Sequence, residues 1–201
     1  MLKPQGFDQV QPFTSYEVLE AGGHICKIIQ VSETKSKAGR DMVVVLLDTD
    51  ATDKQPGYFK KKFDNNQNPD KKWPNNATIR QLVYDADNNP SKGFVTFIDC
   101  VKKCYPGLTD DKIFGNFPIG TNLKGKLIGG IFGREEYLNN YGDSKFAVKF
   151  QSFRTLEDIK KGVEVPKDKL LNPGSSNNNN SNVPDIYGDL EIDTSDSEMP
   201  F

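Results

Sequence analysis

Lysine and arginine residues occur beside aromatic residues at several places along the chain. Basic side chains neutralise phosphates and aromatic rings stack on unpaired bases, so this combination suits binding of single-stranded nucleic acid without sequence preference. For any one residue, ordinary surface or core is an equally good interpretation, and the prediction concerns the set. The set is Lys37, Arg40, Tyr58, Lys60, Lys62, Lys71, Lys72, Trp73, Arg134, Tyr137, Tyr141, Lys145, Lys149 and Phe153. Trp73, beside two lysines in a polar stretch, fits either a lid over the core or a platform for a base.

The last nineteen residues, 183–201, form a second unit. They contain six carboxylates and no lysine or arginine, so they bury too little apolar surface to offset the entropy of ordering, and we expect a disordered tail. The chain ends on a phenylalanine held extended by the proline before it. A terminal ring beside a carboxylate suits a basic, ring-accepting pocket on a partner. The residues expected to contact this partner are Asp193, Asp196, Glu198, Met199, Pro200 and Phe201.

This ending resembles that of bacterial and phage single-stranded DNA-binding proteins, which close an acidic run with an aliphatic residue, Pro and Phe. Serines interrupt the acidic run here, and Met199 stands where Ile or Leu is more usual. The resemblance implies that the tail recruits replication or recombination proteins, such as a polymerase, a helicase or a recombinase. The matching residues are Asp196, Glu198, Met199, Pro200 and Phe201.

Charge is distributed unevenly between the tail and the rest of the chain. Residues 1–182 hold all 26 basic residues and 22 of the 28 acidic ones, a net charge of +4, whereas the tail holds the other six acids. A mildly basic body with an acidic tail fits a protein that meets a polyanion with one part and a basic partner with the other. Solvated surface charge is the simpler alternative, which +4 alone does not exclude.

The titratable residues favour neither catalysis nor metal binding. The cysteines at 26, 100 and 104 have no metal-ligand or disulfide spacing and a single histidine, His24, accompanies them, so we predict buried structural thiols and no metal site. Glu135 and Glu136 are neighbours on an expected strand and point to opposite faces. No catalytic set and no phosphate-binding glycine loop is evident, so we predict no enzyme activity and no cofactor. No apolar run approaches the roughly 20 residues of a membrane span.

The first half of the body predicts three strands. Two β-rich segments, at 23–32 and 41–50, are joined by a loop with a basic tip that carries Lys37 and Arg40. The third predicted strand is at 57–63, GYFKKKF, where alternation places Tyr58 on one face with two lysines.

The second half predicts a helix and then two more strands. Residues 91–104 carry apolar side chains at spacings of three and four, which predicts an amphipathic helix with Ser91 as its N-cap. Strands at 123–137 and 143–154 follow, joined by a turn at 139–142. In the second of these, Lys145, Lys149 and Phe153 are predicted to share one face. A short helix is expected at 155–161.

This order of elements predicts a mainly β fold: a five-stranded oligonucleotide-binding (OB) barrel with a helix between strands 3 and 4, plus a disordered C-terminal tail. The predicted parts are an N-terminal arm at 1–20, the OB domain at 21–171, an Asn/Ser-rich linker at 172–182 and the acidic tail at 183–201.

The body also resembles a phage-encoded family of single-stranded DNA-binding proteins with an OB-like fold, through the segments AGGHICKI, LKGKLIGGIFGREEY and SFRTLEDIKKG. The resemblance implies a protein that coats and protects single-stranded DNA during phage replication or recombination, in the cytoplasm of the infected bacterium. A homo-oligomer is possible. Two alternatives stay open: a recombination mediator or strand-annealing protein, and an interaction adaptor that does not bind DNA.

Overall fold

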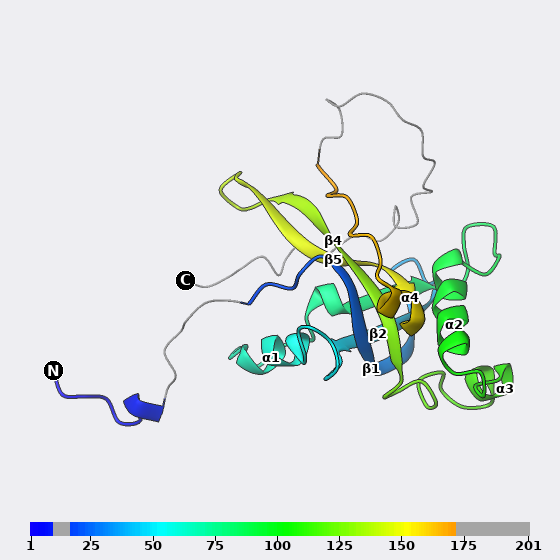
Figure 1. The fold of residues 1–201 in the computed structure, drawn as a ribbon, viewed down its shortest axis with the longest axis horizontal. Coiled ribbons are helices and arrows are strands. Elements are labelled where there is room, and N and C mark those ends of the chain that lie inside the picture. The colour runs from blue at the N-terminus through cyan, green and yellow to red at the C-terminus, as the bar shows by residue number, and fades with distance from the viewer. Residues whose placement is uncertain (10–16, 172–201) are drawn as a thin grey trace.

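A computed structural model describes residues 1–9 and 17–171 of the chain, so the predicted linker and tail lie outside the described residues. Its centre is one antiparallel sheet with the strand order β3-β2-β1-β4-β5 (Figure 1). The strands are β1 (Gly22–Lys35), β2 (Asp41–Thr49), β3 (Thr78–Leu82), β4 (Leu127–Leu138) and β5 (Ser144–Arg154). The helices are η1 (Phe7–Gln9), α1 (Tyr58–Asn65), η2 (Asn75–Ala77), α2 (Lys92–Cys104), α3 (Asp110–Phe114) and α4 (Leu156–Lys161). The predicted mainly β, five-stranded architecture is confirmed.

Strand β1 joins the two halves of the sheet. Its first part, Gly22 to Lys27, pairs with β4, and Cys26 to Lys35 pairs with β2. The register with β2 shifts by one residue between Ile28 and Gln30, and such a bulge bends a strand and increases its twist. One long, bent strand therefore serves both halves, and the predicted strands at 23–32 and 41–50 are confirmed.

The sheet is not closed into a barrel by a strand ladder. Within the described residues, β3 and β5 are the two edge strands and do not pair with each other. The short helix η2 lies between them, because it immediately precedes β3 and its Asn76 side-chain amide donates a hydrogen bond of 3.2 Å to the Val148 carbonyl of β5. The two edges are thus bridged by one turn of helix.

The helix between the third and fourth strands is confirmed as α2. Its first turn is capped by Ser91, whose hydroxyl accepts a hydrogen bond from the Phe94 amide. Its apolar stripe faces the sheet, where the Phe97 ring lies 4.8 Å from the ring of Phe153 on β5. The Ser91 cap and the helical spacing of the apolar residues therefore predicted both the start of α2 and the face that it packs on the sheet.

The predicted third strand at 57–63 is wrong, because this segment forms helix α1. The Asp48 carboxylate on β2 accepts hydrogen bonds from the Phe59 and Lys60 amides at 3.0 and 3.2 Å, and the Thr49 hydroxyl accepts one from the Tyr58 amide. These side chains satisfy the free amides of the first helical turn from outside the segment. The actual third strand is β3, which follows η2 directly.

A register shift in β5 overturns the prediction that Phe153 points outward with Lys145 and Lys149. Ile131 pairs with Ser152, but the next residue of β4 pairs with Phe150, which leaves Gln151 as an extra residue. The side chains beyond the bulge change face. Phe153 is therefore buried, with its ring 4.6 Å from that of Phe150.

Helix α4 and the segment after it cover the junction of β1 and β4. Thr155 and Asp158 form a capping box at the start of α4, as expected for a short helix here. A Cβ on Gly129 would lie 2.5 Å from Ile159, so the helix packs directly on the backbone of β4. Further on, Lys169 pairs with the edge of β4 at Glu135, beyond the point where β1 begins.

Part of the predicted N-terminal arm joins the core. Leu19 is 2% exposed, although it belongs to the 1–20 segment predicted as an arm. Gln55 holds this stretch by accepting a hydrogen bond from the Glu20 amide at 2.8 Å and donating one to the Val18 carbonyl at 3.0 Å. In the part of the chain that the structure describes, no helix has the length and apolar character to span a bilayer.

Candidate nucleic-acid interface

The β4–β5 hairpin carries six of the predicted residues and extends away from the sheet (Figure 1). Tyr137 and Lys145 are directly opposite each other in the register. Opposed residues of an antiparallel pair share one face, so a ring and an ammonium group stand side by side there. Tyr141, in the turn, is 75% exposed, and Tyr137 is 42% exposed. These rings are accessible to a base.

Two lysines share a carboxylate on the same face of the hairpin. The Lys149 ammonium lies 3.3 Å from Glu135, and Lys169 lies 3.0 Å from the other oxygen of that carboxylate. Exposed ion pairs of this kind contribute about 0–1 kcal/mol each. A phosphate can therefore compete with Glu135 for either lysine at low cost.

Arg134 lies on the opposite face of the hairpin from Lys149. Its guanidinium carbon is 4.5 Å from the centroid of the Phe146 ring, and one of its nitrogens is 3.5 Å from Asp168. Phe146 is 41% exposed, so this stacked pair is also accessible, but from the other side.

Helix α1 and the loop after it form a second group. The Lys71 ammonium lies 4.7 Å from the centroid of Phe63, whose ring is 5.4 Å from that of Trp73. The Trp73 indole N–H donates to the Leu47 carbonyl at 2.9 Å, and the ring packs partly buried against the core. Of the two interpretations of Trp73, the structure shows the lid. The remaining exposed side of the cluster carries Lys71.

The other lysines of this group are at the surface. Lys60 pairs with Asp64 across one helical turn at 2.7 Å, with both side chains exposed. Lys62 and Lys72 are exposed, and neither forms an ion pair within the described residues. They add positive charge around the Phe63–Trp73 cluster.

The first two groups are brought together by one contact. Asn76, three residues after Trp73, donates to the backbone of β5 at Val148, next to Lys149. The loop that carries Lys71 and Trp73 therefore lies beside the base of the hairpin that carries Lys145 and Lys149.

Lys37 and Arg40 lie apart from these groups, at the turn between β1 and β2. That turn is next to the far end of β3, since the Val83 amide donates to the Asp41 carbonyl. Strand β3 runs from η2 at its start to this turn at its end. Arg80 is the exposed residue of that strand, while Ile79 and Gln81 on either side are buried.

Two predicted rings are unavailable to a ligand in this structure. Tyr58 is 8% exposed and Phe153 is 2% exposed. Tyr58 is buried because its segment is a helix, and Phe153 because of the bulge at Gln151. Both belong to the core.

The sequence interpretation missed Arg80, Phe63 and Phe146. The signal for Arg80 is the alternation in TIRQL, where Ile79 and Gln81 turn inward and Arg80 outward. The two phenylalanines appear beside cations only once the helical form of α1 and the register of the hairpin are known.

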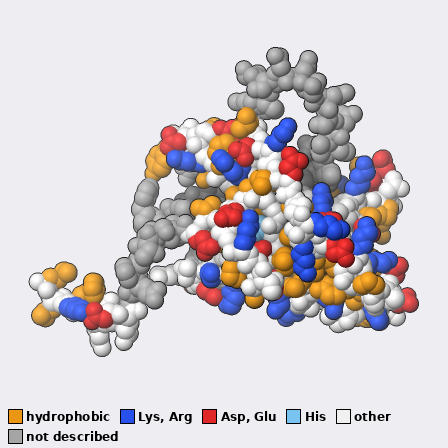
Figure 2. Space-filling view, in the orientation of Figure 1, with side chains coloured by type: hydrophobic (Ala, Val, Ile, Leu, Met, Phe, Trp, Pro, Cys, Tyr) orange, Lys and Arg blue, Asp and Glu red, His pale blue; other side chains and the backbone are white. Residues whose placement is uncertain are grey.

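The basic side chains do not form a single dense patch. Figure 2 shows lysine and arginine spread over one face of the molecule, with aspartate and glutamate among them. Ligand affinity on such a surface depends on local pairs of cation and ring more than on net charge.

The cysteines of the body show no metal-binding arrangement among the described residues. No cluster of His, Cys, Asp and Glu within the described residues could hold a metal ion. Cys26 and Cys100 are buried and Cys104 is half-buried, all as free thiols. Burial raises the pKa of Cys100 to about 11, so this thiol stays protonated and unreactive.

No protein-family model matches this chain, and no curated protein matches it in sequence.

Proposed function

We propose that this protein binds single-stranded DNA through the β4–β5 hairpin and the adjoining loop after α1. The chemistry is the neutralisation of phosphates by Lys71, Lys145 and Lys149, and the stacking of bases on Tyr137 and Tyr141. The contact between Asn76 and Val148 carries the proposal, because it holds the loop after α1 beside the base of the hairpin although the two are far apart in the sequence.

The order of the strands and the position of α2 also support this proposal. We propose that the sheet is an OB barrel in which η2 replaces the usual pairing of the third and fifth strands. The strand order and the helix between β3 and β4 agree with that fold. OB folds bind oligonucleotides on the face of their second and third strands and through the β1–β2 and β4–β5 loops. This binding face of OB folds would include the β1–β2 turn, which carries Lys37 and Arg40, and strand β3, which carries the exposed Arg80.

The tail gives the protein a second role. Its acidic residues and its Met-Pro-Phe ending support recruitment of replication or recombination enzymes, by analogy with the single-stranded DNA-binding proteins that it resembles. The biological setting that we propose is phage DNA replication or recombination in the cytoplasm of the infected host cell.

A titration of the full chain with oligo-dT at several salt concentrations tests the proposal. Trp73 is the only tryptophan, and it lies in the proposed surface, so its fluorescence reports binding directly. We expect binding at 50 mM salt that weakens steeply as salt rises, since counterions are released from the phosphates. No binding at 50 mM salt would rule out the proposal and favour the adaptor alternative.

A second measurement separates a coat from an annealing protein. The protein is mixed with two complementary labelled strands, and the rate of duplex formation is compared with the rate without protein. A coat slows or leaves this rate unchanged, whereas a strand-annealing protein increases it. Oligo-U in place of oligo-dT reports the preference for DNA over RNA.

A further inference from the structure

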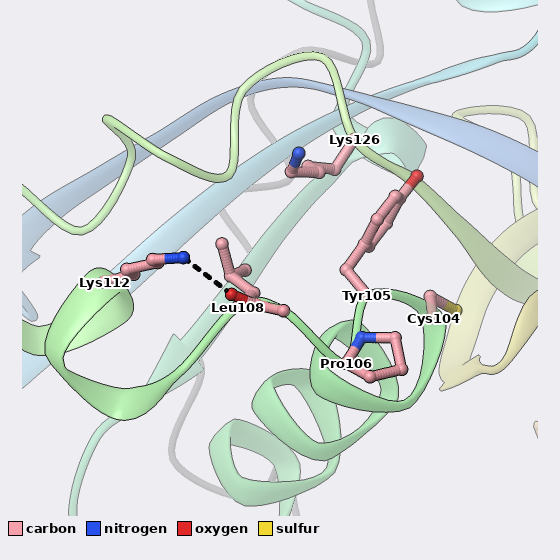
Figure 3. A pocket seen from close by; sticks show the side chains of 7 residues that line it. Cys104, Tyr105, Pro106, Leu108, Lys112 and Lys126 are labelled. Carbon is pink, nitrogen blue, oxygen red and sulfur yellow. Dashed lines mark hydrogen bonds between the residues drawn. The ribbon is translucent and has the colours of Figure 1, made fainter.

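A hollow of about 430 Å³ lies where the end of α2 meets α3 and the segment before β4. This volume is within the range of about 300–1,000 Å³ that is typical of sites for small ligands. Figure 3 shows Leu108 and Pro106 at its floor, the Tyr105 ring at one side, and two lysines that reach toward the same space. The hollow is at the opposite end of β4 from the β4–β5 turn, and the 12 residues of that strand extend over about 40 Å.

The two lysines bring positive charge that no acid in the hollow offsets. Lys112 donates a hydrogen bond to the Gly107 carbonyl at 2.9 Å, and the Lys126 ammonium lies 4.8 Å from the centre of the Tyr105 ring. Among the described residues, neither lysine forms an ion pair and no carboxylate lines the hollow. An ammonium group has three N–H donors, so both lysines retain donors for an anion.

The nearest acid on α3 is already neutralised. Asp110, two residues before Lys112, pairs with Lys102 of α2 at 2.9 Å. This ion pair joins α2 to α3 at the edge of the hollow. The charge inside the hollow therefore stays positive.

The apolar part of the hollow is held in place by the start of β4 and by the core. The Tyr105 hydroxyl accepts a hydrogen bond from the Leu127 amide at 2.7 Å, which fixes the ring. Leu108 is buried at 8% exposure, while Pro106 is exposed at the rim. A ring and aliphatic groups fixed in this way suit a flat, partly apolar group such as a nucleobase.

Lys126 lies over the face of the Tyr105 ring. A cation–π contact at an exposed site is weaker than charge-assisted hydrogen bonds from an ammonium group to a phosphate. A phosphate in the hollow therefore draws the ammonium group away from the ring. The ring face that it leaves becomes available to a base.

We propose that the hollow binds a nucleoside monophosphate, with the phosphate between Lys112 and Lys126 and the base against Tyr105 and Leu108. A phosphate monoester carries close to two negative charges at neutral pH, which two lysines match, whereas a carboxylate carries one. The same chemistry has two sources, a free nucleotide and the phosphorylated end of a DNA strand. This site goes beyond the proposed function, because it recognises a single nucleotide at the other end of β4 from the hairpin turn.

Calorimetric titration of the full chain with thymidine 5′-monophosphate (dTMP) tests the inference. We expect dTMP to bind at least about fivefold more tightly than thymidine or inorganic phosphate, since only dTMP contacts both the lysines and the apolar floor. Lys112→Ala and Lys126→Ala should each weaken dTMP binding by about fivefold or more. The matched control is Lys124→Ala, which removes an exposed lysine of the same segment that does not line the hollow, and it should leave the affinity unchanged.

Three forms of oligo-dT identify the source of the nucleotide: one with a 5′-phosphate, one with a 3′-phosphate and one with neither. If a terminal phosphate increases affinity, and Lys112→Ala and Lys126→Ala abolish the increase, the ligand is the end of a strand. If dTMP binds at these lysines and the three oligonucleotides bind equally, the ligand is a free nucleotide.

The inference is wrong if dTMP does not bind at millimolar concentration, or if Lys124→Ala weakens it as much as the other two variants do. Loss of dTMP binding in Tyr141→Ala would place the nucleotide at the hairpin instead. Tighter binding of 3-phenylpropionate, an aromatic carboxylate, than of dTMP would assign the hollow to an acidic peptide. Oligo-dT without a terminal phosphate should bind the three lysine variants as it binds wild type, so a failure of the proposed DNA surface is detected separately.

Discussion

The buried imidazole of His24 and the carboxylate of Asp53 are joined by a hydrogen bond, with 2.9 Å between Nδ1 and the nearest oxygen. The second ring nitrogen lies 2.9 Å from the Glu20 carbonyl oxygen. Asp53 also accepts hydrogen bonds from the Ile25 and Gln55 amides. The pair therefore fastens the loop after β2 to the start of β1.

Replacing Asp53 with Ala should destabilise the protein by about 2 kcal/mol, because it leaves the buried His24 ring and the Ile25 amide without the acceptor that they share. Urea unfolding measures the change. Asp70→Ala, at an exposed loop position, is the control and should change the free energy of unfolding by less than about 0.5 kcal/mol. A loss as small as that of the control would show that the pair does not stabilise the fold.

The same pair predicts a dependence of stability on pH. Burial acts to raise the pKa of Asp53, but hydrogen bonds from His24 and from backbone amides outweigh it and hold this pKa below its ordinary value. A carboxyl with a lowered pKa contributes stability above the unfolded pKa of about 3.9, and that stability is lost as pH falls through the folded pKa. The difference in stability between wild type and Asp53→Asn should therefore shrink below about pH 4. A difference that stays constant from pH 7 to pH 3 would contradict this linkage.

Asp48→Ala should loosen helix α1 and the aromatic cluster attached to it. The lost cap costs about 1–2 kcal/mol, and the emission of Trp73, which packs on Phe63 of that helix, should shift toward that of exposed indole. Asp48→Asn retains an acceptor oxygen and should have a smaller effect in both measurements. Equal effects of the two variants would show that the charge, and not the cap, matters.

The Asp48 cap also explains why the sequence predicted a strand at 57–63. The period of two in GYFKKKF fits a strand, and the i, i+4 spacing of Phe59 and Phe63 fits a helix equally well. The decision comes from a carboxylate ten residues earlier that folds back on the first turn. By contrast, α2 has its cap at Ser91 and a long apolar stripe, so its position followed from local residues alone.

The candidate site also depends in part on contacts between distant residues, which the sequence could not predict. The sequence indicated the lysines and the tyrosines of the β4–β5 hairpin as binding residues, and the rings of Tyr137 and Tyr141 are exposed. The burial of Phe153 depends on one extra residue at Gln151, which reverses the faces of the strand without a sequence signal. The position of the loop after α1 beside the hairpin depends on the hydrogen bond between Asn76 and Val148, residues 72 apart in the chain. Long-range contacts of this kind are not encoded in local patterns.

Lys145→Gln and Lys149→Gln should each weaken oligo-dT binding and lower its salt dependence. A lysine that neutralises one phosphate of a single strand contributes about 0.7 to the slope of log K against log salt, and each substitution should reduce the slope by that amount. Lys160→Gln, an exposed lysine on α4, is the control. If all three variants show the same slope, the hairpin lysines do not contact phosphates.

Tyr141→Ala should reduce affinity for oligo-dT by roughly 5- to 150-fold, since stacking of one base contributes about 1–3 kcal/mol. Stability should not change, because the ring is exposed at the turn. Tyr141→Phe keeps the ring and should retain nearly full affinity. Phe153→Ala should show the reverse pattern: a loss of about 3–5 kcal/mol of stability from the core, with unchanged affinity of the molecules that remain folded. If Tyr141→Ala binds as wild type does, the hairpin turn contributes no stacking, and the base contacts must be sought at Tyr137 or along β3 near Arg80.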